Sequence, residues 1–262
     1  MKNISDRKRI VVKVGTSTLT HRTGMLNIRR VEQLVKTLAD IQNSGHEVIL
    51  VSSGAIGLGM GKLGLRERPK DTPGKQACAA VGQCELMYLY DNLFAEYSIT
   101  VAQMLLTKYI LLEDRRKNVE NAMERLIAHG VIPIINENDT VAIDELELEV
   151  GENDSLAATV AAIAKADLLI IMSDIDGLYD KDPHTYDDAR LIPVVHEITD
   201  DIRALAGGAG TKLGTGGMIT KLNAVEIAYD SDIDVVLMNG QHPKTLYDLF
   251  DGKTVGTFFC KK

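Results

Sequence analysis

Short apolar runs alternate with longer amphipathic stretches along most of the chain. Runs typical of strands buried on both faces begin near Ile10, Glu47, Ile99, Val131 and Asp167, and two more lie at 233–238 and 254–259. Between these runs, apolar positions recur every three or four residues, as in helices that cover a sheet. Strands that alternate with helices predict an α/β protein with a mainly parallel sheet covered on both faces.

Helix start signals place two of the covering helices. Asn27 is expected to cap a helix that Gly45 ends, and Thr72 with Pro73 is expected to begin a long helix towards Tyr97. The apolar positions expected on one side are Ile28, Val31, Leu34, Val35, Leu38 and Ile41 in the first helix, and Ala77, Val81, Cys84 and Tyr88 in the second. Further expected elements are a helix at 118–129, a solvated antiparallel arm at 141–150, a helix at 155–165 capped by 151–154, a short strand at 189–195 and a helix from 218 to about 230.

No repeat, low-complexity tract or proline- and serine-rich linker divides the 262 residues, so one domain of two lobes is expected, with the second lobe beginning near Asp167. The 37 acidic and 29 basic residues leave a net charge of −8, which disfavours nonspecific binding to nucleic acids or anionic membranes. The three cysteines have no Cys-x-x-Cys spacing and are typical of a reducing compartment. With no signal peptide and no apolar run long enough to cross a bilayer, a soluble cytoplasmic protein is expected.

The first predicted strand contains a charged residue that its apolar pattern does not explain. Lys13 lies inside the run that begins at Ile10, and Gly15, Thr16 and Ser17 follow it. An ammonium group there requires an anion, and the N–H and hydroxyl groups of this turn can donate to phosphate oxygens where the strand ends. The alternative is a lysine that reaches solvent from an edge strand before an ordinary turn.

Polar or glycine-rich segments follow several other strands at their carboxyl ends, where α/β sheets bind ligands. Lys221 opens a helix after glycine-rich residues 214–217, so N–H groups and the helix dipole favour an anion there; the alternative is a solvated lysine. Segment 136–140 is either a binding segment or a turn. Asp154 either orients the two lysines or caps a helix, and the pair 173–174 either holds ribose or phosphate or caps the next helix.

The common nucleotide and metal motifs are missing or misplaced. Gly252-Lys253-Thr254 has Tyr247 where a P-loop needs its first glycine. The formal Gly-x-Gly-x-x-Gly match at 59–64 lies well past its strand rather than at the turn. The six histidines have no metal-ligand spacing, which argues against a zinc site or a Ser/His/Asp triad.

The lack of a candidate catalytic histidine suits phosphoryl transfer to a carboxylate. Such an acceptor has a pKa of about 4, is ionised at neutral pH and needs no general base. The remaining obstacle is repulsion from the triphosphate, which lysines and Mg²⁺ on the phosphates can offset. Asp139 can hold an ammonium group, and donors for carboxylates are available at Ser53, Asn136, Asn153 and the backbone of Gly54 and Ala55.

Seven segments, in order along nearly the whole chain, resemble the amino acid kinase family, and within it the members that phosphorylate glutamate. They are KVGTS at 13–17, SSGAI at 52–56, QMLLT at 103–107, INEND at 135–139, GEND at 151–154, SD with GLY at 173–179, and GTGGM with TK at 214–221. The resemblance implies a three-layer αβα sandwich with a mainly parallel central sheet. It also implies one domain, 1–262, with an N-lobe of about 1–166 for glutamate and a C-lobe of about 167–262 for ATP.

The resemblance further assigns roles to residues. It implies that Lys13 and Lys221 stabilise the phosphoryl group in transfer and that Asp154 orients them. The residues expected to hold glutamate are Ser53, Gly54, Ala55, Asn136, Asp139 and Asn153. Those expected to bind ATP are Lys13, Gly15, Ser17, Ser173, Asp174, Thr215, Gly216, Gly217, Met218, Ile219, Thr220 and Lys221. Mg²⁺ is expected on the phosphates, with no metal ligand from the protein.

The implied product is γ-glutamyl phosphate, the first intermediate of proline synthesis, which a γ-glutamyl phosphate reductase consumes. The family resemblance also implies feedback inhibition by proline and a dimer or tetramer. Many relatives carry a small RNA-binding-like C-terminal domain, whereas this sequence stops at Lys262, and serine stands at 173 where threonine is expected.

Three alternatives remain open. An N-acetylglutamate kinase would have no ammonium group to bind, a uridylate kinase would need to recognise a base, and a ligand-sensing relative would not need both lysines and Asp154. The acidic segment 136–139 and the retained charges favour a kinase that acts on a free amino acid.

Overall fold

The computed structural model of the chain describes residues 4–21, 25–107, 113–141, 152–206 and 217–261. The predicted arm at 141–150, apart from Val141, and the predicted contacts at Thr215 and Gly216 therefore lie outside the described residues.

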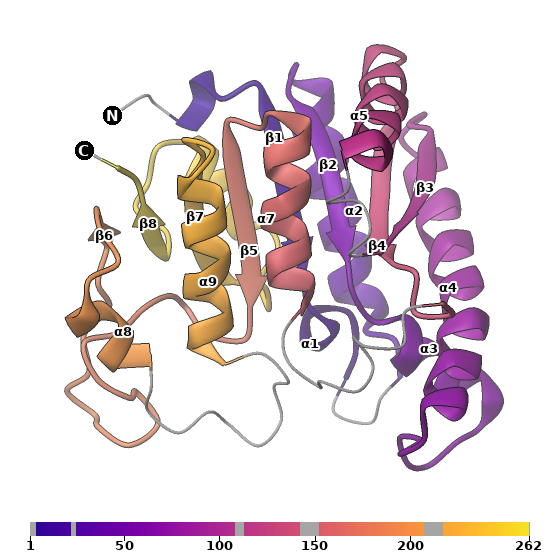
Figure 1. The fold of residues 1–262 in the computed structure, drawn as a ribbon, viewed down its shortest axis with the longest axis horizontal. Coiled ribbons are helices and arrows are strands. Elements are labelled where there is room, and N and C mark those ends of the chain that lie inside the picture. The colour runs from indigo at the N-terminus through magenta and orange to yellow at the C-terminus, as the bar shows by residue number, and fades with distance from the viewer. Residues whose placement is uncertain (1–3, 22–24, 108–112, 142–151, 207–216, 262) are drawn as a thin grey trace.

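Eight strands of the described residues form one sheet (Figure 1). They are β1 Arg9–Val14, β2 Glu47–Ser52, β3 Val101–Leu106, β4 Ile132–Glu137, β5 Leu168–Ser173, β6 Val194–Val195, β7 Asp234–Asn239 and β8 Thr257–Phe259. Their order across the sheet is β3-β4-β2-β1-β5-β7-β8-β6. Every described pairing is parallel except that of β7 with β8, which confirms the mainly parallel sheet.

Helices cover both faces of the sheet, as the three-layer αβα prediction requires. They are α1 Thr16–Leu19, α2 Ile28–Asn43, α3 Ala55–Leu63, α4 Thr72–Ala95, α5 Glu113–Ala128, α7 Glu152–Ala164, α8 Asp200–Ala206, α9 Met218–Tyr229 and α10 Thr245–Phe250, with a 3₁₀ turn, η1, at Ile4–Asp6. Helices α5, α7 and α9 share a core with one face, whereas α2, α4 and α10 share a core with the other.

The alternation of side chains along the central strand β1 divides it between the two cores. Val11 packs under α7 and α9, whereas Ile10, Val12 and Val14 pack on the side of α2 and α4. Lys13 has the parity of Val11, so its side chain leaves β1 on the α7 side. Because β1 pairs with both β2 and β5, this lysine lies in the middle of the sheet.

The long helix α4 turns a different face inward from the one expected. Tyr88 is 68% exposed and Cys84 is exposed, whereas Cys78, Gly82 and Leu86 are buried, so the prediction for this face is wrong. The reason is that α4 has apolar residues on several sides, and periodicity alone does not select one of them. Contact with α3 selects the face, since α3 and α4 approach so closely at Gly82 that an added Cβ would lie 1.7 Å from the carbonyl oxygen of Ala55.

Several boundaries also differ from expectation. The side chain of Asp71, rather than Thr72, caps α4 by accepting a hydrogen bond from the Gly74 N–H at 2.9 Å. Ile28, expected on the apolar face of α2, is 61% exposed. The predicted strand at 189–195 is reduced to β6, and the one-turn helix α1 and the helix α10 were not expected. The Asn27 cap is confirmed, because its side chain accepts from the N–H of Arg30.

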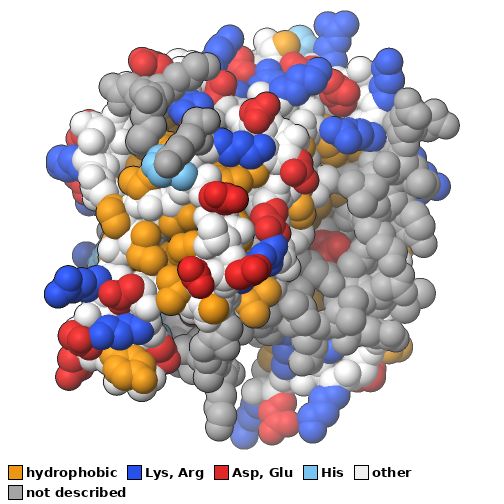
Figure 2. Space-filling view, turned by 60° about the vertical axis from the view of Figure 1, so that its left-hand side comes forward, with side chains coloured by type: hydrophobic (Ala, Val, Ile, Leu, Met, Phe, Trp, Pro, Cys, Tyr) orange, Lys and Arg blue, Asp and Glu red, His pale blue; other side chains and the backbone are white. Residues whose placement is uncertain are grey.

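The surface carries charges of both signs. Figure 2 shows acidic, basic and apolar side chains interspersed on the described part of the face that it presents. Within the described residues, no helix combines the length and the apolar character that a membrane span requires. Cys78 and Cys260 are buried, Cys84 is exposed, and all three are free thiols; burial raises the pKa of the Cys78 and Cys260 thiols, which keeps both protonated.

Candidate active site

Two buried lysines, distant in the sequence, meet on a single carboxylate at the carboxyl edge of the sheet. Nζ of Lys13 lies 2.6 Å from Oδ1 of Asp154, and Nζ of Lys221 lies 3.2 Å from Oδ2. Asp154 is 1% exposed, and the two lysines are 8% and 6% exposed. Both ammonium groups contact the same carboxylate, and cationic side chains at this edge of the sheet favour an anionic ligand.

The packing of β1, α7 and α9 explains why these three groups meet. Lys13 projects from β1 towards α7, and Asp154 lies in the first turn of α7, where the helix dipole favours a negative charge. The buried face of α7 includes Ala157, Ala158 and Ala161, and these small side chains let the helix pack closely against β1 and α9. Lys221, in the first turn of α9, is thereby brought to the same carboxylate.

Electrostatics keep this carboxylate ionised. Burial by itself raises the pKa of Asp154, but the positive charges of Lys13 and Lys221 outweigh it and hold the pKa below the ordinary value of 3.8. Thr220 adds a longer hydrogen bond, from its Oγ1 to Oδ2 at 3.4 Å. Asp154 therefore orients both ammonium groups as an anion at neutral pH.

The alternatives considered from sequence for these residues are wrong. Lys13 does not lie on an edge strand, because β1 is paired on both sides. Lys221 is buried rather than solvated. Asp154 is not a plain cap, because it lies inside α7 and both of its oxygens contact lysines.

A second group of polar side chains lies at the ends of β2 and β4. Nδ2 of Asn153 donates to Oγ of Ser53 at 2.5 Å and, at 3.4 Å, to Oδ1 of Asn136. Nδ2 of Asn136 in turn donates to Oε1 of Gln83 on α4 at 2.9 Å. The structure thus brings together three of the predicted substrate residues, and Gln83 joins them without having been predicted. Its only signal in the sequence is its position on α4, which identifies it once the buried face of that helix is known.

The other predicted substrate groups surround this cluster. Gly54 has a φ of 103°, a conformation that favours glycine, and lies directly before α3. Ala55 opens α3, where backbone N–H groups precede the first helical hydrogen bond and suit a carboxylate. Asp139 lies two residues beyond β4 and is partly exposed.

The predicted phosphate-binding residues described here lie at the ends of the neighbouring strands β1 and β5. Gly15 has a φ of −82°, so its conformation does not demand glycine; an added Cβ would instead lie 3.7 Å from Nζ of Lys13 and occupy space beside the ammonium group. Ser17 is exposed on α1. At the end of β5, the hydroxyl of buried Ser173 donates to the exposed Asp174 carboxylate at 3.1 Å.

The described end of the glycine-rich segment leads directly into α9. Gly217 is exposed and precedes the helix, and Met218, Ile219 and Thr220 form its first turn, with Ile219 49% exposed. Gly59, from the apparent dinucleotide motif, lies inside α3, where an added Cβ would lie 1.8 Å from the Cys78 carbonyl oxygen. That glycine therefore serves the packing of α3 on α4.

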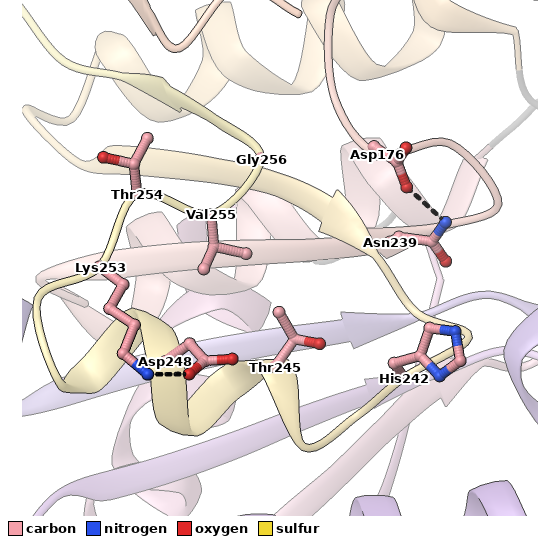
Figure 3. Close-up of a pocket in the computed structure, with 9 residues that line it drawn as sticks. All are labelled: Asp176, Asn239, His242, Thr245, Asp248, Lys253, Thr254, Val255 and Gly256. Carbon is pink, nitrogen blue, oxygen red and sulfur yellow. Dashed lines mark hydrogen bonds and ion pairs between the residues drawn. The ribbon is translucent and has the colours of Figure 1, made fainter.

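A separate open pocket of about 390 Å³ lies in the C-terminal half (Figure 3). Its lining includes Asp176, which follows β5, and Asn239, at the end of β7, whose side-chain N–H donates to Asp176 at 2.7 Å. Lys253 and Asp248 form an ion pair on its other side at 2.5 Å. The sequence did not predict this pocket, because its walls come from β7, α10 and the loops after β5 and before β8.

Comparison with known proteins decides the family. Residues 8–239 match the model of the amino acid kinase family. This chain belongs to the amino acid kinase family. The match covers every described residue of the Lys13–Asp154–Lys221 cluster and of the polar group around Asn153.

Relatives within the amino acid kinase family share about half of their residues with this chain. It is 52% identical over 264 residues to glutamate 5-kinase from Clostridium perfringens, covering 100% of this chain and 98% of the relative. Identity to the Clostridium tetani glutamate 5-kinase is 53% over 257 residues, covering 98% and 96%. Identity to the glutamate 5-kinase of Caldanaerobacter subterraneus is 53% over 252 residues, which cover 96% of this chain but 67% of that relative.

Solved structures agree on the amino acid kinase fold. UMP kinase from Bacillus anthracis superposes with a TM-score of 0.66 at 16% identity, covering 98% of this chain and 97% of the other. Isopentenyl phosphate kinase from T. acidophilum gives a TM-score of 0.64 at 20% identity, with coverages of 96% and 100%. At these identities the likeness concerns the fold alone.

Proposed function

We propose that this chain is a kinase that transfers the γ-phosphoryl group of ATP to the side-chain carboxylate of L-glutamate, forming γ-glutamyl phosphate. The observation that carries the proposal is the convergence of Lys13 and Lys221 on Asp154 at the carboxyl edge of the sheet. The relatives named glutamate 5-kinase support glutamate as the acceptor.

The proposed step needs no proton transfer. A carboxylate oxygen of glutamate forms a bond to the γ-phosphorus, the bond from that phosphorus to the β–γ bridging oxygen breaks, and ADP leaves with the electron pair. The acceptor is already ionised at neutral pH, so charge neutralisation and positioning are the requirements. Lys13 and Lys221 stabilise the negative charge of the phosphoryl group, and Asp154 orients both lysines from behind.

Glutamate is held at the ends of β2 and β4. The hydroxyl of Ser53 and the backbone N–H groups at the start of α3 donate to carboxylate oxygens. Asn136 and Asn153 shape this part of the site, and the carboxylate of Asp139 pairs with the substrate ammonium group. In this arrangement the N-lobe, about 1–166, holds glutamate, and the C-lobe, about 167–262, holds ATP.

The residues around Lys13 fit a triphosphate. Two of the side chains present, Lys13 and Lys221, are cationic. The missing Cβ of Gly15 leaves space beside the ammonium group of Lys13. Ser17, Ser173, Asp174 and the segment 215–221 complete the nucleotide contacts. Both oxygens of Asp154 face lysines, so we assign Mg²⁺ to the phosphates, where it supplies further charge neutralisation when bound.

The proposed place of the reaction follows from its product. An acyl phosphate is reactive, so a γ-glutamyl phosphate reductase is the enzyme expected to consume it, which makes this the first step of proline biosynthesis in the cytoplasm. A homodimer or homotetramer is proposed as the assembly. The acidic net charge and the mixed charges in Figure 2 are the reasons for proposing neither nucleic acid nor membrane as a partner.

The deciding experiment traps the acyl phosphate. The purified protein receives ATP, Mg²⁺, hydroxylamine and one acceptor at a time: L-glutamate, N-acetyl-L-glutamate or L-aspartate. A hydroxamate is expected with L-glutamate and little with the others. In parallel, ADP release is measured with UMP, whose phosphorylation produces no hydroxamate. Nucleotide turnover with UMP alone, or no turnover with any acceptor, would refute the proposal.

A further inference from the structure

Gln83 is a buried polar residue to which the proposed reaction assigns no role. It lies on α4, is 8% exposed, and its Oε1 accepts the hydrogen bond from Nδ2 of Asn136. Asn136 has the parity of Ile132 and Ile134 in β4, so its side chain leaves the strand on the α4 side. The contact thus joins the helix layer behind the sheet to the substrate end of β4.

The direction of these hydrogen bonds determines which groups remain for a ligand. Since Nδ2 of Asn136 faces Gln83, its Oδ1 is the atom that meets Nδ2 of Asn153. Asn153 then uses the two protons of Nδ2 on Asn136 and Ser53, which directs its own Oδ1 elsewhere. Ser53 accepts that bond, so its hydroxyl proton stays available to donate.

Reversal of these bonds would remove that proton. If Oδ1 of Asn136 faced α4, Nδ2 of Asn136 would donate to Oδ1 of Asn153, and Ser53 would have to donate inward to the same oxygen. The hydroxyl of Ser53 would then no longer donate to a substrate carboxylate. Oδ1 of Asn153 would no longer be available to accept from a substrate ammonium group. An acceptor on α4 at position 83 therefore matters for ligand chemistry as well as for packing.

Helix α4 is held firmly enough to orient Asn136. Gly82 lies against the start of α3, where a Cβ would lie 2.5 Å from the Gly59 nitrogen and 1.7 Å from the carbonyl oxygen of Ala55. Further along the same face, the hydroxyl of buried Tyr90 lies 2.9 Å from Oγ of Ser52 in β2. Contacts on both sides of Gln83 therefore fix its distance from the strand ends.

We propose that Gln83 is a positioning residue for the amino-acid substrate, acting through Asn136 and Asn153 to direct the hydroxyl proton of Ser53 towards a substrate carboxylate. This inference rests on the proposed function. Within the described residues, Nε2 of Gln83 is buried and has no hydrogen-bond partner. The substitution Gln83→Glu therefore removes no hydrogen bond. The substitution Gln83→Met, which introduces a side chain of similar size, removes the acceptor.

The test compares Gln83→Met with Gln83→Glu in steady-state kinetics. Gln83→Met is expected to raise KM for glutamate about tenfold, the effect of about one lost hydrogen bond, while KM for ATP changes by less than about twofold. Gln83→Glu, whose carboxyl oxygen can accept the same hydrogen bond, is expected to stay within about threefold of wild type for both substrates. Gln83→Leu, which also lacks an acceptor, provides a second test if Gln83→Met does not fold.

The matched control is Thr37→Val on α2. Thr37 is 1% exposed and its hydroxyl donates to the carbonyl oxygen of Gln33 at 2.8 Å, so this change also removes a buried hydrogen bond. It is expected to lower the melting temperature without changing either KM. A double-mutant cycle adds a second readout: in an Asn136→Ala background, Gln83→Met is expected to have almost no further effect on KM for glutamate.

The possible outcomes distinguish a failure of the positioning role of Gln83 from a failure of the proposed reaction. A wild type that forms no hydroxamate with glutamate would overturn the proposed function and this inference with it. If the wild type is active and its Gln83→Met variant keeps the same KM for glutamate, the positioning role of Gln83 alone would be overturned. A parallel rise in both KM values, additive effects with Asn136→Ala, or a Gln83→Glu variant weaker than Gln83→Met would also overturn that role.

Discussion

Asp154→Asn tests the centre of the site because it removes one charge from between two buried cations. Nζ of Lys13 and Nζ of Lys221 lie 2.6 and 3.2 Å from its oxygens, and the side chains of the two lysines are 10% and 8% exposed. Breaking a buried ion pair by removing one partner costs about 3–5 kcal/mol, because the remaining charge is left uncompensated. Asparagine is of similar size, so no cavity contributes to this loss.

The expected loss of stability is large enough to measure by thermal unfolding. For a chain of this size, 1 kcal/mol corresponds to a shift in melting temperature of about 2–4 °C, so Asp154→Asn is expected to melt about 6–20 °C below wild type. The matched control is Asp188→Asn, which removes the carboxylate that pairs with Lys181 at 2.5 Å and is 78% exposed. An exposed pair contributes at most about 1 kcal/mol, so the control is expected to melt close to wild type.

ATP provides the decisive comparison. If the two lysines bind phosphate, bound ATP supplies the negative charge that asparagine lacks, and ATP with Mg²⁺ is expected to raise the melting temperature of Asp154→Asn more than that of wild type. Turnover in the hydroxamate assay is expected to fall by about 10²–10³, because the lysines lose the group that orients them. A variant with the stability, ATP response and turnover of wild type would refute this reasoning.

Three further predictions follow from the same contacts. Lys13→Ala and Lys221→Ala are each expected to lower turnover by well over tenfold while circular dichroism shows a folded protein; near-normal rates would contradict their role. Asp139→Asn is expected to raise KM for glutamate by about tenfold or more and to leave KM for ATP unchanged, and equal effects on both would contradict an ammonium site. Burial raises the pKa of Asp154, but the two lysines outweigh this effect and hold the pKa below 3.8. The stabilisation that ionised Asp154 gives the folded state is therefore complete above the unfolded-state pKa, and it is lost as the pH falls through the folded-state pKa. In urea unfolding, the difference between wild type and Asp154→Asn is therefore expected to stay constant down to about pH 4 and to shrink below it, whereas a difference that shrinks near neutral pH would contradict this assignment.

Much of the fold could be predicted from local patterns. Apolar runs identified the central strands, and β2 begins at the predicted residue, Glu47, because a strand buried on both faces needs nearly every residue to be apolar. Asn27 was recognised as a cap because its side chain can accept the hydrogen bond of an unpaired N–H group. The face of α4 could not be predicted, since it depends on the close approach of α3 at Gly82.

In the candidate site, too, some residues could be predicted from the sequence and others could not. Lys13, Lys221 and Asp154 stood out in the sequence because charged residues beside buried strands and helix starts need partners. Gln83 did not stand out, because a glutamine on a helix with several apolar faces carries no local signal until its buried side is known. The pocket beside Asp176 was missed because segments far apart in the sequence build its walls.

The sequence by itself determined the alternation of strands and helices, the family and the chemical groups available at the strand ends, because these depend on the residues of each segment and on their order. Only the tertiary structure decided which groups meet. Lys13 reaches Asp154 because the parity of β1 directs it under α7, and Gln83 reaches Asn136 because two glycines let α3 and α4 pack backbone to backbone. Hydrogen bonds and ion pairs act over a few ångströms, and such distances between remote segments are set by packing.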